Sequence, residues 1–112
     1  MGNSVSAAEL ARMLAGVSPP IVVDARKDLA CSESGLAIPA TMRIPPQSVE
    51  AAAGGLSGHT VVVYCVHGHE VSQGACAVLR RLGADAYYLE GGFEGWRDFG
   101  LPVEAAGEGK QT

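Results

Sequence analysis

The apolar run at residues 61–65, which reads Val-Val-Val-Tyr-Cys, constrains the fold more than any other feature of the sequence. Branched and aromatic side chains favour a β-strand, and a strand that is apolar at every position is buried on both faces. Such strands are typical of parallel sheets that helices cover on either side. A loop containing Gly68 follows the run, and a helix is predicted from about residue 72 to 82, closed by Gly83.

Shorter elements repeat the same alternation along the chain. The runs at residues 21–25 and 86–89 each predict a short strand, and short helices are expected at about residues 47–53 and around Trp96. Strands that alternate with helices indicate an α/β fold. We therefore expect an α/β protein with a mainly parallel central sheet and helices on both faces.

The first helix carries its own start signal. Ser6 with Glu9 three residues later is a capping-box pattern, in which each side chain bonds to the backbone of the other residue. Leu10, Met13 and Leu14 follow at helical spacing and would form the apolar stripe of this helix.

The length of 112 residues favours a single domain over residues 1–112. Residues 26–41 show little periodicity and are expected to form a long connection. The ordered core is expected to extend over about residues 6–103. Residues 104–112 are polar and small, which predicts a flexible tail.

Charge and composition exclude several classes of protein. The net charge is −4 at pH 7 and no Lys/Arg run exists, so the electrostatic footprint of a nucleic-acid-binding protein is missing. No apolar run is long enough to span a membrane, and residues 1–14 lack the pattern of a signal peptide. The three cysteines, Cys31, Cys65 and Cys76, are irregularly spaced and do not suggest a disulfide framework. We expect a cytoplasmic protein that uses at least one thiol and has no nucleic-acid or membrane partner.

Cys65 stands where chemistry is expected in such a fold. Ligands of open parallel sheets bind outside the carboxyl ends of the strands, and Cys65 ends the strand that is most strongly predicted. A tight loop between that strand and the next helix can turn several N–H groups inward and make an anion-binding nest. These groups favour the thiolate, which is the nucleophilic form of cysteine. His67 and His69 would add positive charge when protonated.

Two other interpretations of this segment remain open from the residues alone. Free cysteines are often buried, so Cys65 could be a core residue of the strand. Cys65, His67 and His69 could also bind a metal if the segment were extended, with Glu70, Cys31 or water as the fourth ligand.

Four segments resemble the rhodanese-like sulfurtransferases, in the same order and with similar spacing. Residues 61–68 are similar to the active-site loop of that family, with its cysteine after a strand. Residues 22–26 resemble the early strand with its Asp-x-Arg end, and residues 37–40 resemble the segment around Ile-Pro. Residues 89–96 with 100–103 resemble the C-terminal signature. One such motif would be weak, but four in order cover nearly the whole chain.

The resemblance implies a sulfurtransferase in which Cys65 is the catalytic nucleophile and carries a persulfide. The donor would be thiosulfate, a polysulfide or a persulfide, and the acceptor a thiol, cyanide or a sulfur-acceptor protein. No metal or organic cofactor is implied. The backbone N–H groups of the active-site loop would hold the terminal sulfur. That loop comprises Val66, His67, Gly68, His69, Glu70 and Val71.

The chain departs from the family in its loop. Family loops often end in Arg or another residue suited to an anionic donor, whereas the corresponding region here is Glu70-Val71. A carboxylate at the loop repels thiosulfate, which favours a polysulfide or persulfide donor. If Ser72 caps the helix, the loop from Cys65 to Val71 has seven residues, as in related phosphatases and arsenate reductases, which share the fold. Those enzymes need Arg where Val71 stands, because a phosphate dianion is bound by a bidentate cation. An oxyanion-handling enzyme and a non-catalytic binding module remain the alternatives.

We expect the candidate residues outside the loop to be structural or to lie at the edge of the site. Asp24 and Arg26 end a strand and are candidates for the rim of the pocket, although a salt bridge or loop anchor is the preferred interpretation. Arg26 could supply the cation that the loop lacks. Cys76 is expected in the core, and Cys31 is expected to be exposed in the long connection.

Overall fold

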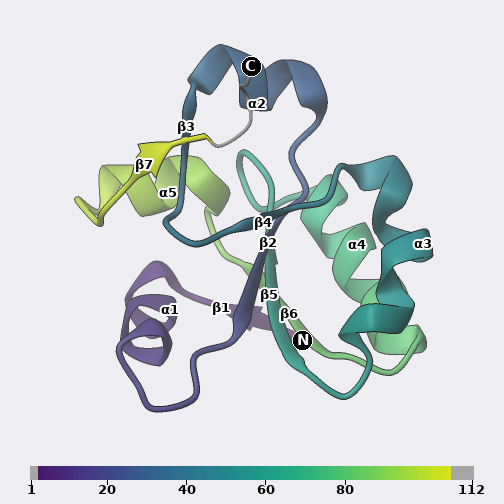
Figure 1. Ribbon diagram of the computed structural model, residues 1–112. Helices are drawn as coiled ribbons and strands as arrows, with labels where there is room; N and C mark the ends of the chain where they lie inside the picture. Colours follow the sequence, from purple (N-terminus) through teal and green to yellow (C-terminus); the bar gives the residue numbers. More distant parts are fainter. Residues whose placement is uncertain (1–2, 107–112) are drawn as a thin grey trace.

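The computed structural model describes residues 3–106 and contains a central sheet of five parallel strands (Figure 1). The strand order is β1-β6-β5-β2-β4, and every neighbouring pair is parallel. The strands are β1 (Ser4–Val5), β2 (Ile21–Asp24), β4 (Met42–Arg43), β5 (Thr60–Tyr64) and β6 (Asp85–Leu89). A second, small sheet pairs β3 (Leu36–Ala37) with β7 (Glu104–Ala105) in antiparallel fashion.

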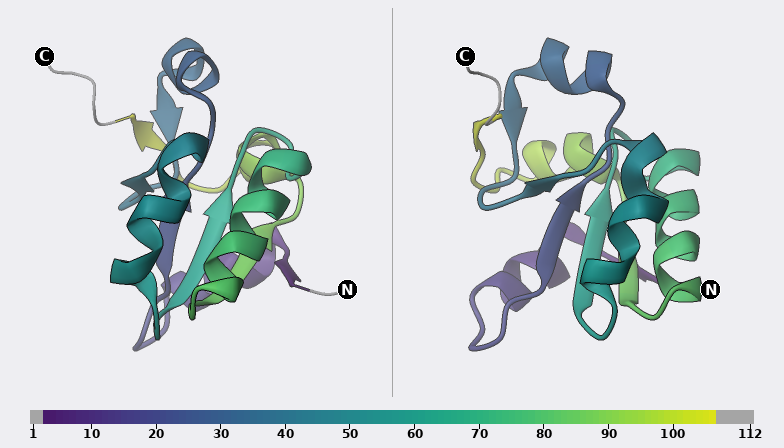
Figure 2. Two further views of the ribbon diagram at one scale, coloured as in Figure 1. Left: turned by 90° about the vertical axis from the view of Figure 1, so that its right-hand side faces the viewer. Right: turned by 45° about the vertical axis from the view of Figure 1, so that its right-hand side comes forward.

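Helices cover both faces of the central sheet, as the sequence predicts. Figures 1 and 2 show α3 and α4 on one face, α1 and α5 on the other, and α2 beyond the carboxyl ends of the strands. The helices are α1 (Ala7–Leu14), α2 (Asp28–Ser34), α3 (Val49–Ala52), α4 (Glu70–Arg81) and α5 (Gly92–Asp98). Short 3₁₀ helices, Pro46–Ser48 and Ala53–Leu56, flank α3. Within residues 3–106, no helix is both long and apolar enough to cross a bilayer.

Strand β5 shows why the apolar run at its centre determines the fold. Successive side chains of a strand point to opposite faces. Val61 and Val63 pack into the cluster that includes α3 and α4, whereas Val62 and Tyr64 pack into the cluster that includes α1 and α5. All four side chains are completely buried, so each face of β5 needs its own layer of helices.

Most of the predicted helix signals are confirmed, but one helix start is wrong. Ser6 and Glu9 form the predicted capping box, with Glu9 N–H donating to Ser6 Oγ at 3.1 Å and Ser6 N–H to Glu9 Oε1 at 2.7 Å. The helix predicted from residue 72 begins at Glu70, and His69 is its N-cap residue. Ser72 therefore lies inside the first turn of α4 and does not cap it.

The long connection predicted at residues 26–41 contains the helix α2 and the strand β3. None of the residues of α2 is buried, so this helix has no apolar stripe that a search for periodicity would find. The tail predicted to be flexible from Glu104 begins instead with β7, which pairs through Ala37 with Glu104 and through Leu36 with Ala105. Backbone pairing needs no apolar side chain, so the sequence pattern does not indicate this strand. Residues 107–112 lie outside the described residues.

Candidate active site

Cys65 follows β5 directly and lies at the carboxyl edge of the sheet. Its neighbour Tyr64 is in register with Asp24 at the end of β2, so the ends of these two strands meet. Cys65 is buried, with 5% of its surface exposed. The topology thus brings the predicted nucleophile beside the predicted rim residues Asp24 and Arg26.

The start of α5 holds the loop after Cys65. The N–H of Phe93 donates to Cys65 O at 2.8 Å, and the N–H of Glu94 donates to Val66 O at 3.0 Å. A trans peptide group keeps its C=O and N–H on opposite sides. Because these two carbonyls point at α5, the N–H groups of Val66 and His67 point away from it. The loop amides are therefore oriented by a partner helix.

Two glycines allow the loop to press against the turn between β6 and α5. Gly68 has φ +77°, and a Cβ built there would lie 2.6 Å from Leu89 O. Gly92 has φ +60°, and its Cβ would lie 2.5 Å from Cys65 O. Real Cβ atoms do not approach backbone atoms this closely, so both positions require glycine for space and for conformation.

Ser72 is a functional candidate that the sequence interpretation missed. Its hydroxyl lies 3.2 Å from Cys65 Sγ, and Ser72 is completely buried. In an α-helix the Cα–Cβ bond tilts toward the N-terminus, so a side chain in the first turn of α4 reaches back to the loop. The sequence could have indicated this contact only if the helix had been predicted to begin at Glu70. Ser72, seven positions after Cys65, would then lie in the first turn of that helix.

Hydrogen bonds around Cys65 set its protonation. Burial raises the pKa of the thiol, but the Ser72 hydroxyl and the N–H groups of Ser72, Gly68 and His69 lower it. The net effect is a pKa below the ordinary value for cysteine. As a thiol, Cys65 donates to Ser72 Oγ; as a thiolate, it accepts from the hydroxyl and from the three amides. The loop thus favours the nucleophilic form.

Cys65 lies in a cleft of about 490 Å³ that brings most of the predicted site residues together. The loop contributes Val66, His67, His69, Glu70 and Val71, and the segment after β2 contributes Arg26, Lys27 and Ala30. Two predicted residues do not line the cleft. They are Asp24 and Gly68, and Gly68 packs against the backbone of Leu89 and Gly91. The rings of His67 and His69 are 6.1 Å apart, and both residues are exposed.

Asp24 and Arg26 form the predicted salt bridge, which is confirmed as a buried, bidentate pair. Arg26 Nη2 lies 2.7 Å from Asp24 Oδ2, and Arg26 Nε lies 3.0 Å from Asp24 Oδ1. Arg26 also donates to Leu36 O at 2.8 Å and stacks 4.5 Å from the Phe93 ring. Its charge is balanced by Asp24 and only 1% of its surface is exposed. Arg26 anchors the connection to α2 and gives the cleft little free positive charge.

The other two cysteines differ from Cys65 in their surroundings. Cys76 is buried in the core, as predicted. Cys31, which was expected to be exposed, is half-buried with its Sγ 3.7 Å from Asp24 Oδ2. Burial and the Asp24 carboxylate raise the pKa of Cys31, so this thiol is a weaker nucleophile than Cys65.

The structure also bears on two of the alternatives. Because α4 begins at Glu70, the segment between β5 and α4 ends at His69, and the seven-residue count that linked the loop to phosphatases is wrong. Among residues 3–106, no three His, Cys, Asp or Glu side chains gather in a way that could hold a metal ion.

Comparisons with known proteins agree with this geometry. Residues 6–99 match the rhodanese-like domain family. A rhodanese-related protein from Thermoplasma volcanium has a similar structure, with a TM-score of 0.78 and 26% identity, over 92% of this chain and 98% of that protein. A rhodanese-like domain protein from Staphylococcus aureus gives a TM-score of 0.77 and 26% identity, over 93% and 100% of the two chains.

A curated protein, the thiosulfate sulfurtransferase GlpE of Actinobacillus succinogenes, is 47% identical to this chain over 49 residues. That alignment covers 43% of each protein, so the match extends over less than half the length of this relative.

Proposed function

This chain belongs to the rhodanese-like domain family and has the rhodanese fold, and on that premise we propose that it is a sulfurtransferase. Sulfane sulfur is carried as a persulfide on Cys65. The observation that carries the proposal is the set of donors around Cys65 Sγ, the Ser72 hydroxyl and three backbone N–H groups. The name of the partial relative, thiosulfate sulfurtransferase, supports the same chemistry.

The first half-reaction loads Cys65. The thiolate attacks the outer sulfur of the donor, an S–S bond forms at Sγ, and the sulfur–sulfur bond of the donor breaks. With thiosulfate the leaving group is sulfite, which takes the bonding electron pair. The same donors that favour the thiolate then face the terminal sulfur of the anionic persulfide, much as an oxyanion hole faces developing charge.

The second half-reaction removes the sulfur from Cys65. An acceptor, either a thiolate or cyanide, attacks the terminal sulfur, and Cys65 leaves as a thiolate with the electron pair of the broken S–S bond. The hydrogen bonds that lower the pKa of Cys65 make it a better leaving group in this step. No external oxidant or reductant enters either step.

Charge in the cleft bears on the choice of donor. Glu70 lines the cleft at the first position of α4, while Arg26 is neutralised by Asp24. Lys27 is the cation of the cleft wall that forms no ion pair within residues 3–106. With these charges the cleft attracts the doubly negative thiosulfate ion only weakly. We therefore propose that polysulfides or low-molecular-weight persulfides are the better donors.

The lack of a free cation beside Cys65 also disfavours phosphatase or arsenate reductase activity. Phosphate and arsenate dianions need a bidentate cation beside the nucleophile, but no Arg or Lys stands between Cys65 and Arg80, and Arg26 in the cleft is paired with Asp24. A non-catalytic module, in turn, would have no use for a thiol whose pKa is lowered by four hydrogen bonds.

A turnover assay tests the proposal. Polysulfide or thiosulfate is supplied with cyanide, and thiocyanate is measured for the wild type, Cys65→Ser and Cys31→Ser. We expect turnover in the wild type and in Cys31→Ser, which alters a cysteine of raised pKa outside the Cys65 cleft. Loss of turnover in Cys31→Ser alone, or turnover that persists in Cys65→Ser, would contradict the assignment.

A further inference from the structure

Hydrogen bonds from two helices hold carbonyl groups of the loop after Cys65. Two N–H groups at the start of α5 hold the carbonyls at the beginning of the loop. A further carbonyl, Gly68 O, accepts a hydrogen bond at 3.0 Å from Nε2 of Gln73 on α4. The donors on α5 belong to the backbone, whereas the donor on α4 is a side chain that a substitution can remove.

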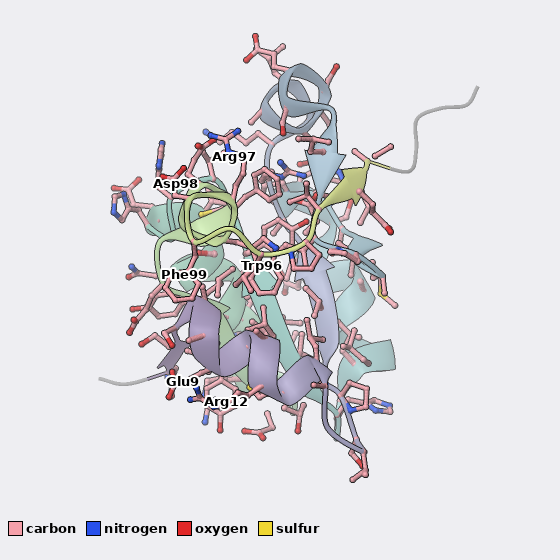
Figure 3. The ribbon with its side chains drawn as sticks, turned by 90° about the vertical axis from the view of Figure 1, so that its left-hand side faces the viewer. Glu9, Arg12, Trp96, Arg97, Asp98 and Phe99 are labelled. Carbon is pink, nitrogen blue, oxygen red and sulfur yellow. The ribbon has the colours of Figure 1, made fainter. Side chains whose placement is uncertain are left out.

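Helix α5 is anchored in the core, so its two hydrogen bonds fix the beginning of the loop. Trp96 of α5 is buried in the core cluster that includes Leu10 of α1, and Figure 3 shows its side chain between the two helices. Trp96 Nε1 also donates to Pro102 O at 2.7 Å. The peptide group between Gly68 and His69, at the end of the loop, is held from α4 by Gln73.

The hydrogen bond from Gln73 determines which way this last peptide group faces. Its C=O belongs to Gly68 and its N–H to His69, and a trans peptide keeps the two on opposite sides. While Gln73 holds the C=O, the N–H is directed the other way, and it is one of the three backbone N–H groups that donate to Cys65 Sγ. A carbonyl only accepts hydrogen bonds, so only a side chain with a donor can hold it.

Gln73 can fill this role without being part of the core. It is exposed and lies in the first turn of α4, where the Cα–Cβ bond tilts toward the N-terminus and brings the side chain back to the loop. Replacing an exposed side chain leaves no cavity in the core. An effect of Gln73 on Cys65 can therefore be measured apart from an effect on folding.

We propose that Gln73 is a positioning residue, which holds the Gly68 carbonyl and thereby directs the His69 N–H at the sulfur of Cys65. Gln73 does not touch the reacting atoms and acts only through the peptide group that it holds. The inference rests on the proposed function, which makes the Cys65 thiolate the reactive group, but its test needs no sulfur donor.

The substitution Gln73→Met tests this role, because Met has nearly the same helix propensity as Gln and no donor. The rate at which iodoacetamide alkylates Cys65 is measured as a function of pH. A whole hydrogen bond to a charged group is worth a factor of about ten or more. For a donor that is misdirected and not deleted, we expect the thiolate fraction at pH values below the pKa to fall about three- to tenfold. At pH values above the pKa in both proteins the rates should converge.

A second glutamine provides the matched control. Gln47 is exposed in the 3₁₀ helix Pro46–Ser48, and Gln47→Met should keep the wild-type profile. Both variants keep every titratable group that lines the Cys65 cleft, so a shifted profile does not come from a lost charge. These groups are Arg26, Lys27, Cys65, His67, His69 and Glu70.

Amide proton shifts measured by NMR distinguish positioning from a general loosening of the loop. The proton of an N–H that donates to Cys65 Sγ changes its shift when the thiol ionises, and the same titration in a Cys65→Ser background subtracts the effect of the histidine rings. We expect Gln73→Met to lose most of the response of the His69 amide. The response of the Ser72 amide, which belongs to α4, should persist.

The outcomes separate this inference from a structural role and from the proposed function. An alkylation profile of Gln73→Met that matches the wild type, or an undiminished His69 response, would overturn the positioning role. Equal loss of the His69 and Ser72 responses, with a lower free energy of unfolding in urea, would show a structural role and overturn it as well. If Gln73→Met shifts the profile while the wild type takes up no sulfur from polysulfide, the positioning role stands and the proposed function fails.

Discussion

Replacing Ser72 with alanine removes the hydroxyl that lies 3.2 Å from Cys65 Sγ. Both residues are buried, so water does not readily take the place of the lost donor. A hydrogen bond to a charged group contributes about 1.5–3 kcal/mol. Because about 1.4 kcal/mol is a factor of ten, the thiolate fraction at pH values below the pKa should fall about 10- to 100-fold.

The direction of the pH effect follows from the same contact. In the wild type the hydrogen bonds lower the pKa of Cys65, so the thiolate persists to lower pH than in a free cysteine. Loss of the Ser72 hydroxyl raises that pKa, and the reaction of Cys65 should then need a higher pH. At pH values above the pKa in both proteins the thiol is fully ionised, and the two rates should converge.

Alkylation by iodoacetamide as a function of pH, followed at Cys65 by mass spectrometry, measures this shift. Ser48→Ala is a suitable control, because Ser48 is half-buried before α3 and its side chain makes no capping hydrogen bond. We expect its profile to match the wild type. If the midpoint of Ser72→Ala also coincided with the wild type, the argument that Ser72 activates Cys65 would be refuted.

Three further substitutions test the loop glycine, the buried salt bridge and the charge of the cleft. Gly68→Ala places a Cβ at φ +77° and 2.6 Å from a backbone oxygen, so it should lower the free energy of unfolding in urea by at least about 1–3 kcal/mol, whereas Gly54→Ala, in open space, should not. Arg26→Met leaves Asp24 buried without its partner and should cost about 3–5 kcal/mol in the same measurement; near-wild-type stability would show that the pair is dispensable. Glu70→Arg replaces a carboxylate of the cleft with a cation and should lower the KM for thiosulfate by up to about fivefold, and an unchanged KM would show that Glu70 does not affect the choice of donor.

The sheet and the position of Cys65 could be predicted because their signals are local. Each position of the run at residues 61–64 is apolar, and its two faces pack into the two separate core clusters. The nucleophile follows that run directly. The Asp24–Arg26 salt bridge was also predictable, because the two residues stand two positions apart at the end of a strand.

Other features depend on tertiary contacts that leave no pattern in the sequence. Helix α2 buries none of its residues, and β7 is held by backbone pairing with β3. Ser72 was assigned to a helix cap, because Ser is a common cap residue and the true helix start at Glu70 has no such signal. The hydrogen bond from Gln73 to Gly68 O likewise depends on where α4 begins.

The proposed function requires that Cys65 carries the transferred sulfur, and intact mass spectrometry after incubation with polysulfide measures this. We expect that the wild type gains the mass of one sulfur atom, that a thiol such as dithiothreitol removes it, and that Cys65→Ser does not gain it. Thiosulfate, run in parallel, should load the protein less completely. An unmodified wild type, or a sulfur atom that is found equally in Cys65→Ser, would contradict the assignment of Cys65 as the sulfur carrier.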